Sequence, residues 1–524
     1  MTNAPGMQQF LILDRRPHSK AQSALAKYLR RAARGREAPQ GARMNDTIAK
    51  RDQFFWLGEI NKASVIINME RNLLDPGMAE HIAAALRTVL DNGNTEGGKR
   101  PATVITFEPL LIEAGGPEVT LLHAGRSSQD MHGTYYAAIM RDNVLELAAV
   151  LAEATALMLE LAKRHEKTIV PNYTNGVAAQ PNSYGHYLLG FIAGFDRDFS
   201  RLREAYARLD RSPMGTTVLN GSCWPLERER MAAYLGFGEV ADNAYDAVQI
   251  SSMEYPADIG AVVTAVALHV GSFIEDLMTQ YAQPRPWILL REGEGTTYVS
   301  SAMPQKRNPG LLNDTRRDAS TAISLAMGSV LRAHNIPPGM VDAKSATDNS
   351  AMTDKAISVL KGFCKILSSL VVDPDRALEE CNSDWTASQE LADRLMREHG
   401  VPFRVGHHFA SEVVSFAKKR GLTPLTFPYA EAARIFAAMA AEHAGLPDLP
   451  MSEADFKAAL DPVSIVESRA TPGGPQHNEM VRMFAKAEKT LTDNTFWAKG
   501  RKKHITDSLS LLDKTFESLF PGKQ

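Results

Sequence analysis

Residues 142–164 read DNVLELAAVLAEATALMLELAKR, and this stretch gives the first indication of the fold. Its apolar side chains recur every three or four residues, at Val144, Leu147, Val150, Leu151, Ala154, Leu157, Met158 and Leu161. Apolar residues also occupy its other faces, which is typical of a helix buried among several others. We predict a buried helix that begins at Asp142, whose side chain can cap the first turn, and ends near Arg164.

Similar helical patterns recur along the chain, whereas strand signals are sparse. They lie near residues 184–210, 257–282, 311–334 and 351–370. Several long helices that are apolar nearly all round predict an all-α protein with a long central helical bundle. Some faces of this bundle are expected to be buried by other subunits.

Glycine- and proline-containing breaks divide the chain. They lie at Gly115-Gly116-Pro117, Asp373-Pro374-Asp375 and Gly473-Gly474-Pro475. We predict helical domains at 44–118, 119–372 and 373–524, preceded by a basic extension at 1–43.

The composition excludes several classes of protein. The 524 residues carry 58 basic and 61 acidic side chains, a net charge of −3, which gives no electrostatic case for binding nucleic acid or an anionic membrane. The most apolar run, 259–274, contains His269 and falls short of the roughly 20 apolar residues that span a bilayer. Three distant cysteines, Cys223, Cys364 and Cys381, are too few for a disulfide framework or a zinc cluster. We expect a reducing compartment and no structural metal.

The N-terminal segment differs from the rest. Residues 1–43 hold nine lysines and arginines against two acids, Asp14 and Glu37. An arginine-rich, acid-poor start is typical of an organelle transit peptide, but a disordered tail or an upstream start codon gives the same composition. Met44 begins a stretch that is more typical of a globular domain.

Residues 300–309, SSAMPQKRNP, concentrate polar groups in one segment. Pro304 and Pro309 prevent a continuous helix, because each proline lacks an amide donor and clashes with the preceding turn. The segment is therefore a loop, which by itself fits a polar surface as well as a functional site.

This loop resembles the Ser-Ser-x-Met-Pro-x-Lys-x-Asn signature of the fumarase/aspartase superfamily. Four further stretches, in the same order, are similar to its argininosuccinate lyase branch: 123–130 (HAGRSSQD), 173–181 (YTNGVAAQP) with Gly185-His186, 402–404 (PFR) with His407-His408, and Asp461-Pro462 with Ser464, Arg469 and Gly473-Gly474. The resemblance implies a three-domain all-α subunit in a cytoplasmic homotetramer with a core of about 20 helices. It also implies active sites shared between subunits, and neither cofactor nor metal.

The resemblance further implies a chemistry and a set of site residues. Family enzymes remove a proton from carbon beside a carboxylate and then cleave a C–N or C–O bond, releasing fumarate. Ser300 occupies the position of the base. A serine can serve as base only if its oxyanion is stabilised by nearby donors. The positions expected to bind the substrate are Arg126, Ser127, Ser128, Gln129, Thr174, Asn175, Gln180, Ser301, Met303, Lys306 and Asn308.

Some positions depart from the family pattern and change the expected chemistry. The Thr-His of relatives is Thr174-Asn175 here, and the glutamate that supports that histidine aligns with Asn313. The usual general acid is therefore absent, which a leaving amine protonated from water would tolerate. Ser128 replaces an arginine, and Arg307 or Arg316 are candidates to compensate.

The amine side of the site departs as well. The tyrosine, glutamine and lysine that hold the arginine half of argininosuccinate align with Met340, Ser345 and Asp348. We predict a reversible C–N lyase that acts on another N-succinyl amine or amino acid, as ethylenediamine-disuccinate lyases do. The alternatives are argininosuccinate lyase itself, an inert structural homologue, and a module whose basic tail binds acidic partners.

Overall fold

The computed structural model describes residues 51–383, 385–443 and 448–520. The predicted basic extension, 1–43, lies outside the described residues. From Arg51 onward the chain forms one compact unit. The domain boundaries predicted near residues 118 and 372 stay predictions.

The described chain consists mainly of helices, so the all-α prediction is confirmed. The α-helices are α2 (Gln53–Glu70), α3 (Pro76–Asn94), α4 (Val104–Gly115), α5 (Ser128–Arg164), α6 (Tyr184–Leu209), α7 (Arg228–Tyr234), α8 (Ser251–Tyr281), α9 (Gly310–Ala333), α10 (Ala346–Ser369), α11 (Pro374–Ser383), α12 (Ser388–His399), α13 (Phe403–Arg420), α14 (Tyr429–His443), α15 (Glu453–Leu460), α16 (Pro462–Ser468) and α17 (His477–Glu517). Short helical segments are η1 (Pro117–His123), η2 (Asp246–Ile250), η3 (Asp342–Lys344) and η4 (Pro424–Thr426); η2 is a π-helix.

Strands are short and occur in pairs within the described residues. β1 (Ile169–Thr174) pairs antiparallel with β2 (Val177–Ser183), and β3 (Arg211–Ser212) pairs parallel with β4 (Glu239–Val240). β5 (Ile288–Leu290) pairs antiparallel with β8 (Leu370–Val372), and β6 (Tyr298–Val299) with β7 (Arg307–Asn308).

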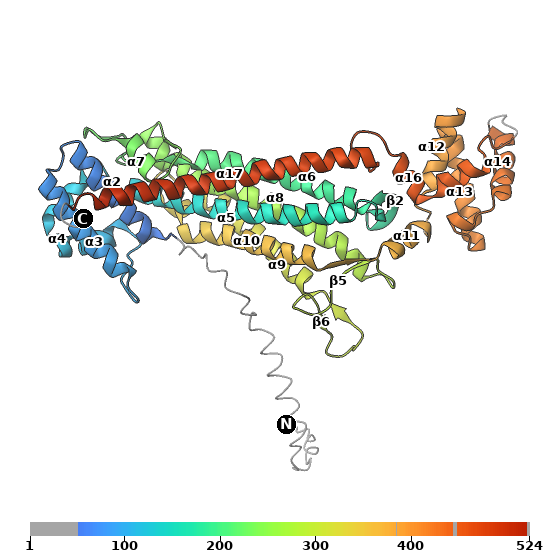
Figure 1. Ribbon diagram of the computed structural model, residues 1–524, viewed down its shortest axis with the longest axis horizontal. Helices are drawn as coiled ribbons and strands as arrows, with labels where there is room; N and C mark the ends of the chain where they lie inside the picture. Colours follow the sequence, from blue (N-terminus) through green and yellow to red (C-terminus); the bar gives the residue numbers. More distant parts are fainter. Residues whose placement is uncertain (1–50, 384, 444–447, 521–524) are drawn as a thin grey trace, which may run out of the picture. The chain divides into compact units, whose positions relative to one another are not determined.

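Helices α5, α6, α8, α9, α10 and α17 lie side by side and form the bundle (Figure 1). The predicted end of α5 at Arg164 is confirmed, but its predicted start is wrong. Ser127 and Asp130 form a capping box that begins the helix earlier, and Asp142 lies inside it, paired with Arg51 at 3.4 Å. The stretch 123–130 thus starts one of the two longest helices of the bundle, which have 37 and 41 residues, as well as carrying a motif.

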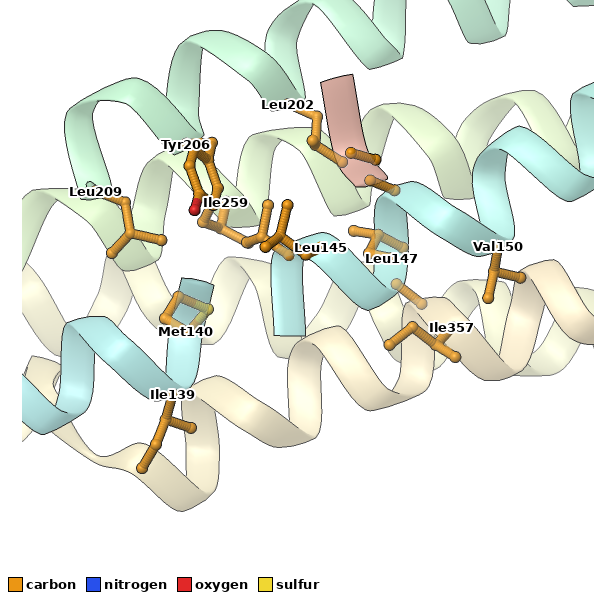
Figure 2. Close-up of a cluster of buried hydrophobic side chains, with 14 of the residues drawn as sticks. Ile139, Met140, Leu145, Leu147, Val150, Leu202, Tyr206, Leu209, Ile259 and Ile357 are labelled. Carbon is orange, nitrogen blue, oxygen red and sulfur yellow. The ribbon is translucent and has the colours of Figure 1, made fainter. Parts of the chain in front are cut away.

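Apolar side chains of helices α5, α6, α8 and α10 pack against one another in the bundle core (Figure 2). Leu147 of α5 and Leu202 of α6 are fully buried, and Ile259 of α8 and Ile357 of α10 are nearly so. A second, smaller apolar core lies within residues 385–460, around Phe409, Phe436 and Phe456. These cores explain why helices with no polar face are stable in this chain.

Residues 246–281 are long and apolar enough to cross a membrane, judged by length and composition alone. Half of their most apolar window is buried, and α8 packs against α6, α9 and α10. We therefore interpret α8 as a bundle helix.

Arg141 joins α5 to the segment after α7. Its guanidinium is fully buried, bonds Asp210 at 2.8 Å and the Leu235 carbonyl at 3.0 Å, and stacks on Phe237 at 3.5 Å. It also donates to the Gly236 carbonyl at 2.5 Å.

Replacing Arg141 by methionine removes the close partner of the buried Asp210 carboxylate and leaves it only Arg501, at 3.9 Å. We expect a loss of about 3–5 kcal/mol in the free energy of unfolding, measured by urea denaturation. Arg164→Met, which removes the exposed pair with Glu160, is the control and should change it by less than about 0.5 kcal/mol. Equal free energies of unfolding for the two variants would show that the buried pair of Arg141 and Asp210 contributes nothing to stability.

Candidate functional site

The signature segment forms a loop, as predicted, closed at its base by two short strands. Tyr298 pairs with Asn308 and Val299 with Arg307. The Ser300 amide donates to the Lys306 carbonyl at 3.1 Å, which continues the pairing by one residue. The loop therefore has a defined conformation although its side chains are largely exposed.

The Ser300 hydroxyl is turned into its own loop. Its oxygen accepts hydrogen bonds from the Ala302 and Met303 backbone amides, at 3.4 and 3.2 Å. Amides aimed at one oxygen stabilise negative charge there. The loop thus supplies donors of the kind that a serine base requires.

The other residues of the loop lie open to solvent in the single chain. Ser301, Met303 and Lys306 are exposed, and Asn308 is half-buried. Arg307 pairs with Glu292 at 2.8 Å and donates to the Pro304 carbonyl at 2.7 Å. Lys306 is consequently the cation of this loop that has no ion pair among the described residues.

The stretch 123–130 spans the start of α5, with Ser128 and Gln129 half-buried in its first turn. Arg126 points inward, where Nη1 donates to Asn61 at 2.9 Å and to Ser64 at 3.2 Å. Burial lowers the pKa of Arg126 to about 10. Arg126 therefore helps to position this segment, and its predicted contact with substrate stays a prediction.

Asp130 is fully buried and connects this segment to a second loop, 214–221. Its carboxylate accepts the Ser127 amide at 2.9 Å and the Thr217 amide at 3.0 Å. Burial raises the pKa of Asp130 to about 6, although both of these hydrogen bonds act to lower it.

The 214–221 loop is strained and was not predicted. Thr217 and Val218 have φ angles of 49° and 77°, which β-branched residues rarely adopt. The Leu219 amide donates to the Thr217 carbonyl at 3.1 Å, a γ-turn centred on Val218. Strain of this kind gathers at functional sites. The only signal in the sequence is the pair of glycines at 215 and 221.

The stretch 173–181 forms the β1–β2 hairpin. Asn175 and Gly176 make its turn, with φ of 55° and 74°, and Thr174 pairs with Val177. An Asn-Gly turn of this kind favours asparagine over histidine, so the departure at Asn175 has a structural reason. Gln180 donates to Gln389 of α12 at 2.6 Å.

The β1–β2 hairpin and the start of α6 contact the last motif of the chain, residues 461–474. His186 Nε2 lies 2.7 Å from the Gly473 carbonyl, and His477 lies 2.7 Å from Glu166. Asp461 caps α16, and Arg469 pairs with the buried Glu390 at 2.7 Å. His186 therefore has a structural partner, as does His123, which pairs with Glu108 at 3.0 Å.

The residues of the predicted amine side lie between α9 and α10. Met340 is 45% exposed, and Ser345 caps α10 by accepting the Asp348 amide at 3.2 Å. Asn313 is half-buried in the first turn of α9. This region connects to the 123–130 segment through η2, because Lys344 donates to the Val248 carbonyl at 2.9 Å and the next residue, Gln249, donates to the Val218 carbonyl at 3.4 Å. Thr217, which precedes Val218, donates its amide to Asp130.

One chain thus holds the predicted site residues in three separate groups. The first is 126–130 with 214–221 and 340–348; the second is the β1–β2 hairpin with 461–474; the third is the signature loop. The first two lie at opposite ends of α5, whose 37 residues span about 55 Å (Figure 1). Among the described residues, no hydrogen bond or ion pair joins Ser300 or Lys306 to either of the other groups.

The sequence and the fold were compared with known proteins. A family model described as lyase matches residues 31–323, and one described as argininosuccinate lyase C-terminal matches residues 385–467. The argininosuccinate lyase of Geobacillus sp. (strain WCH70) is 30% identical over 426 residues, 79% of this chain and 87% of that protein. That of Methanosarcina barkeri is 28% identical over 421 residues, covering 79% and 81%.

Solved structures share the fold. A crystal structure of EDDS lyase in complex with formate has a TM-score of 0.80 at 23% identity, covering 89% of this chain and 92% of that chain. The fumarate lyase from Mesorhizobium sp. BNC1 has a TM-score of 0.61 at 15% identity, covering 85% and 96%. The predicted helical-bundle fold of this superfamily is therefore confirmed.

The raised pKa of Asp130 predicts a pH dependence of stability. Between pH 3.8 and about 6 the folded chain binds a proton at Asp130 that the unfolded chain has released. The contribution of Asp130 to stability is therefore fully present below pH 3.8. It falls by about 3 kcal/mol as the pH rises through 6. We expect the difference in unfolding free energy between wild type and Asp130→Asn to fall across this window. A difference that stays constant from pH 4 to pH 8 would contradict it.

Proposed function

The chain belongs to the argininosuccinate lyase branch of the fumarase/aspartase superfamily, and we propose that it releases fumarate from an N-succinyl amine or amino acid other than argininosuccinate. It is a carbon–nitrogen lyase of the argininosuccinate lyase or EDDS lyase type. The observation that carries the proposal is the conformation of the signature loop, whose amides converge on the Ser300 hydroxyl.

Ser300 acts as the base in the proposed mechanism. Its oxyanion, stabilised by the Ala302 and Met303 amides, takes a proton from the succinyl carbon beside one carboxylate. The electron pair left on carbon spreads into that carboxylate as an aci-carboxylate. It then forms the carbon–carbon double bond of fumarate while the C–N bond breaks and its electrons leave with the amine.

The two succinyl carboxylates require separate donors. Lys306 and Asn308 bind the carboxylate that takes up negative charge, since a cation and an amide stabilise it more in the transition state than in the ground state. Ser127, Ser128 and Gln129, with Thr174, Asn175 and Gln180, bind the other. Ser301 and Met303 belong to the same loop as Lys306 and Asn308. No cofactor or metal takes part in these steps.

Three subunits of a homotetramer build each site in this proposal. A helix of about 55 Å separates residues 127–129 from residues 174–180, which bind the same carboxylate in this proposal, so another copy must bring the missing part. Exposed apolar residues on the bundle offer a surface for that copy: Leu268 of α8 is 58% exposed and Leu331 of α9 is 71% exposed.

The leaving amine takes its proton from water. Asn175 and Asn313 stand where relatives have the histidine–glutamate pair, and an amide cannot donate a proton at neutral pH. Asn175 is also fixed in a turn with positive φ. An amine that accepts a proton from solvent as it leaves makes an enzymic acid unnecessary.

Argininosuccinate lyase activity is the second candidate, favoured by the names of the relatives. The observation against this activity is the amine side of the site, at Met340, Ser345 and Asp348. None of these residues offers the contacts of the residues that hold arginine in that branch. The inert homologue is the third candidate, and intact Ser300, Lys306 and Asn308 oppose it. A cytoplasmic location and the role of residues 1–43 stay predictions.

Ser300→Ala should abolish fumarate chemistry. We expect wild type to consume fumarate in the presence of an amine other than arginine, followed by absorbance. We expect Ser300→Ala to lower kcat by roughly 10²–10⁴-fold, the range for loss of a base. Ser510→Ala, on the exposed side of α17, is the matched control and should retain full activity.

Two other results of the fumarate assay would change the proposed function. Consumption with arginine alone would establish argininosuccinate lyase activity and show that the amine side was misread. No consumption with arginine, aspartate, ammonia or ethylenediamine would favour the inert homologue.

Shared sites predict complementation between inactive chains. Ser300→Ala and Gln129→Ala chains, each inactive alone, should regain activity when they are refolded together. In a random one-to-one mixture about a quarter of the sites combine an intact loop with an intact 126–130 segment. A double variant carrying both changes, mixed with itself, is the control. Recovery no greater than this control would mean that each chain holds its own complete site.

A further inference from the structure

We infer that Lys344 binds a carboxylate on the amine half of the substrate, with the Gln249 side-chain oxygen accepting a hydrogen bond from a donor of that half, so that the amine released is an amino acid or another carboxylate-bearing amine. The inference rests on the proposed function and specifies its substrate class. Neither residue belongs to the motifs that the family resemblance brought out.

Lys344 lies at the amine side of the first group of site residues. It ends η3 and directly precedes Ser345, and Met340 lies in the same segment. Whereas Met340 is 45% exposed, Lys344 is only 2% exposed. Its Nζ donates to the Val248 carbonyl in the π-helix η2, at 2.9 Å.

The connection from Lys344 back to the 126–130 segment is short. Gln249 follows Val248, and its Nε2 donates to the carbonyl of the strained Val218 at 3.4 Å. Thr217, next to Val218, donates its amide to Asp130 at 3.0 Å. The buried lysine is thus joined by consecutive contacts to the segment proposed to bind a succinyl carboxylate.

The charge of Lys344 is uncompensated in the part of the chain that the structure describes. It forms no ion pair there, and its one hydrogen bond uses one of the three donors of an ammonium. Burial lowers the pKa of Lys344, with no charged neighbour opposing the shift. A buried ammonium without a counter-charge is costly, and an incoming carboxylate would remove that cost.

Gln249 adds a second buried group with unused bonding capacity. It is 3% exposed, and its Oε1 has no hydrogen-bond partner in the described chain. Gly339 approaches this oxygen so closely that a Cβ there would lie 3.1 Å from it. A buried amide with an unpaired oxygen beside a lysine fits a polar ligand that carries both acceptors and donors, as an amino acid does.

A purely structural role explains these contacts less well. The Val248 carbonyl also accepts the Ser252 hydroxyl, so it does not need the lysine to be satisfied. The lysine bonds a π-helix, and Gln249 of that helix bonds a strained turn; both features are frequent at functional sites. A structural role would predict that loss of Lys344 harms all substrates alike.

The test compares amines that differ only in a carboxylate. The full chain and Lys344→Met are assayed for fumarate addition with glycine, β-alanine, 4-aminobutyrate and aspartate, and with alkylamines of matched length. We expect wild type to prefer the carboxylated amines. Lys344→Met should lower kcat/KM for them by at least tenfold, about the loss of one buried charge pair, while leaving the alkylamines within about twofold. Lys355→Met, which removes the pair with Asp318 on the bundle, is the control and should not change the preference.

Two results would overturn the inference. One is an equal loss of kcat/KM for carboxylated and neutral amines in Lys344→Met, together with a lowered melting temperature. This result would indicate a structural role for the lysine. The other is a wild-type preference for neutral amines. Calorimetric binding of the same amines to Ser300→Ala, with and without Lys344→Met, keeps the test independent of turnover. If wild type turns over no amine, the lyase proposal fails, whereas a carboxylate preference in binding that Lys344→Met removes still supports the lysine.

Discussion

The length of the uninterrupted helix α5 determines how far apart the predicted site residues lie within one chain. Its 37 residues begin at the capping box of Ser127 and Asp130 and end beside the β1–β2 hairpin. Because an α-helix rises 1.5 Å per residue, the polar groups at its two ends cannot meet within one chain. The same helix that contributes to the apolar core of the subunit therefore separates the groups of the proposed site.

Helix capping and the proposed recognition of a carboxylate use the same residues at the start of α5. Asp130 accepts the Ser127 amide and also the Thr217 amide of the strained 214–221 loop, so the helix terminus and the loop share one buried carboxylate. The backbone of Ser127 and the first turn of α5 are thereby fixed before any ligand arrives. Fixed donors bind a carboxylate without paying for their own ordering, which is the advantage of building a site on a helix end.

The sequence predicted the bundle well because buried helices carry apolar residues at a helical period, as in residues 142–164. It misplaced the start of α5, since 127–130 was interpreted as a ligand motif and its capping role was overlooked. The inward turn of Arg126 and the positive φ of Val218 depend on contacts with distant residues, Asn61 and Asp130 among them, so no local pattern predicts them. The loop at 300–309 was predictable because its prolines exclude a helix.

The amine side shows how charge has been redistributed in this chain. In argininosuccinate lyases the lysine of this region aligns with Asp348, which here reverses the charge and lies 4.0 Å from Arg332. A cation reappears four residues earlier, at Lys344, buried and without a counter-charge among the described residues. A buried cation discriminates more strongly than an exposed one, because water neither screens it nor replaces its partner. In the site proposed above, the buried charge of Lys344 therefore favours an amine that carries its own carboxylate over one that carries none.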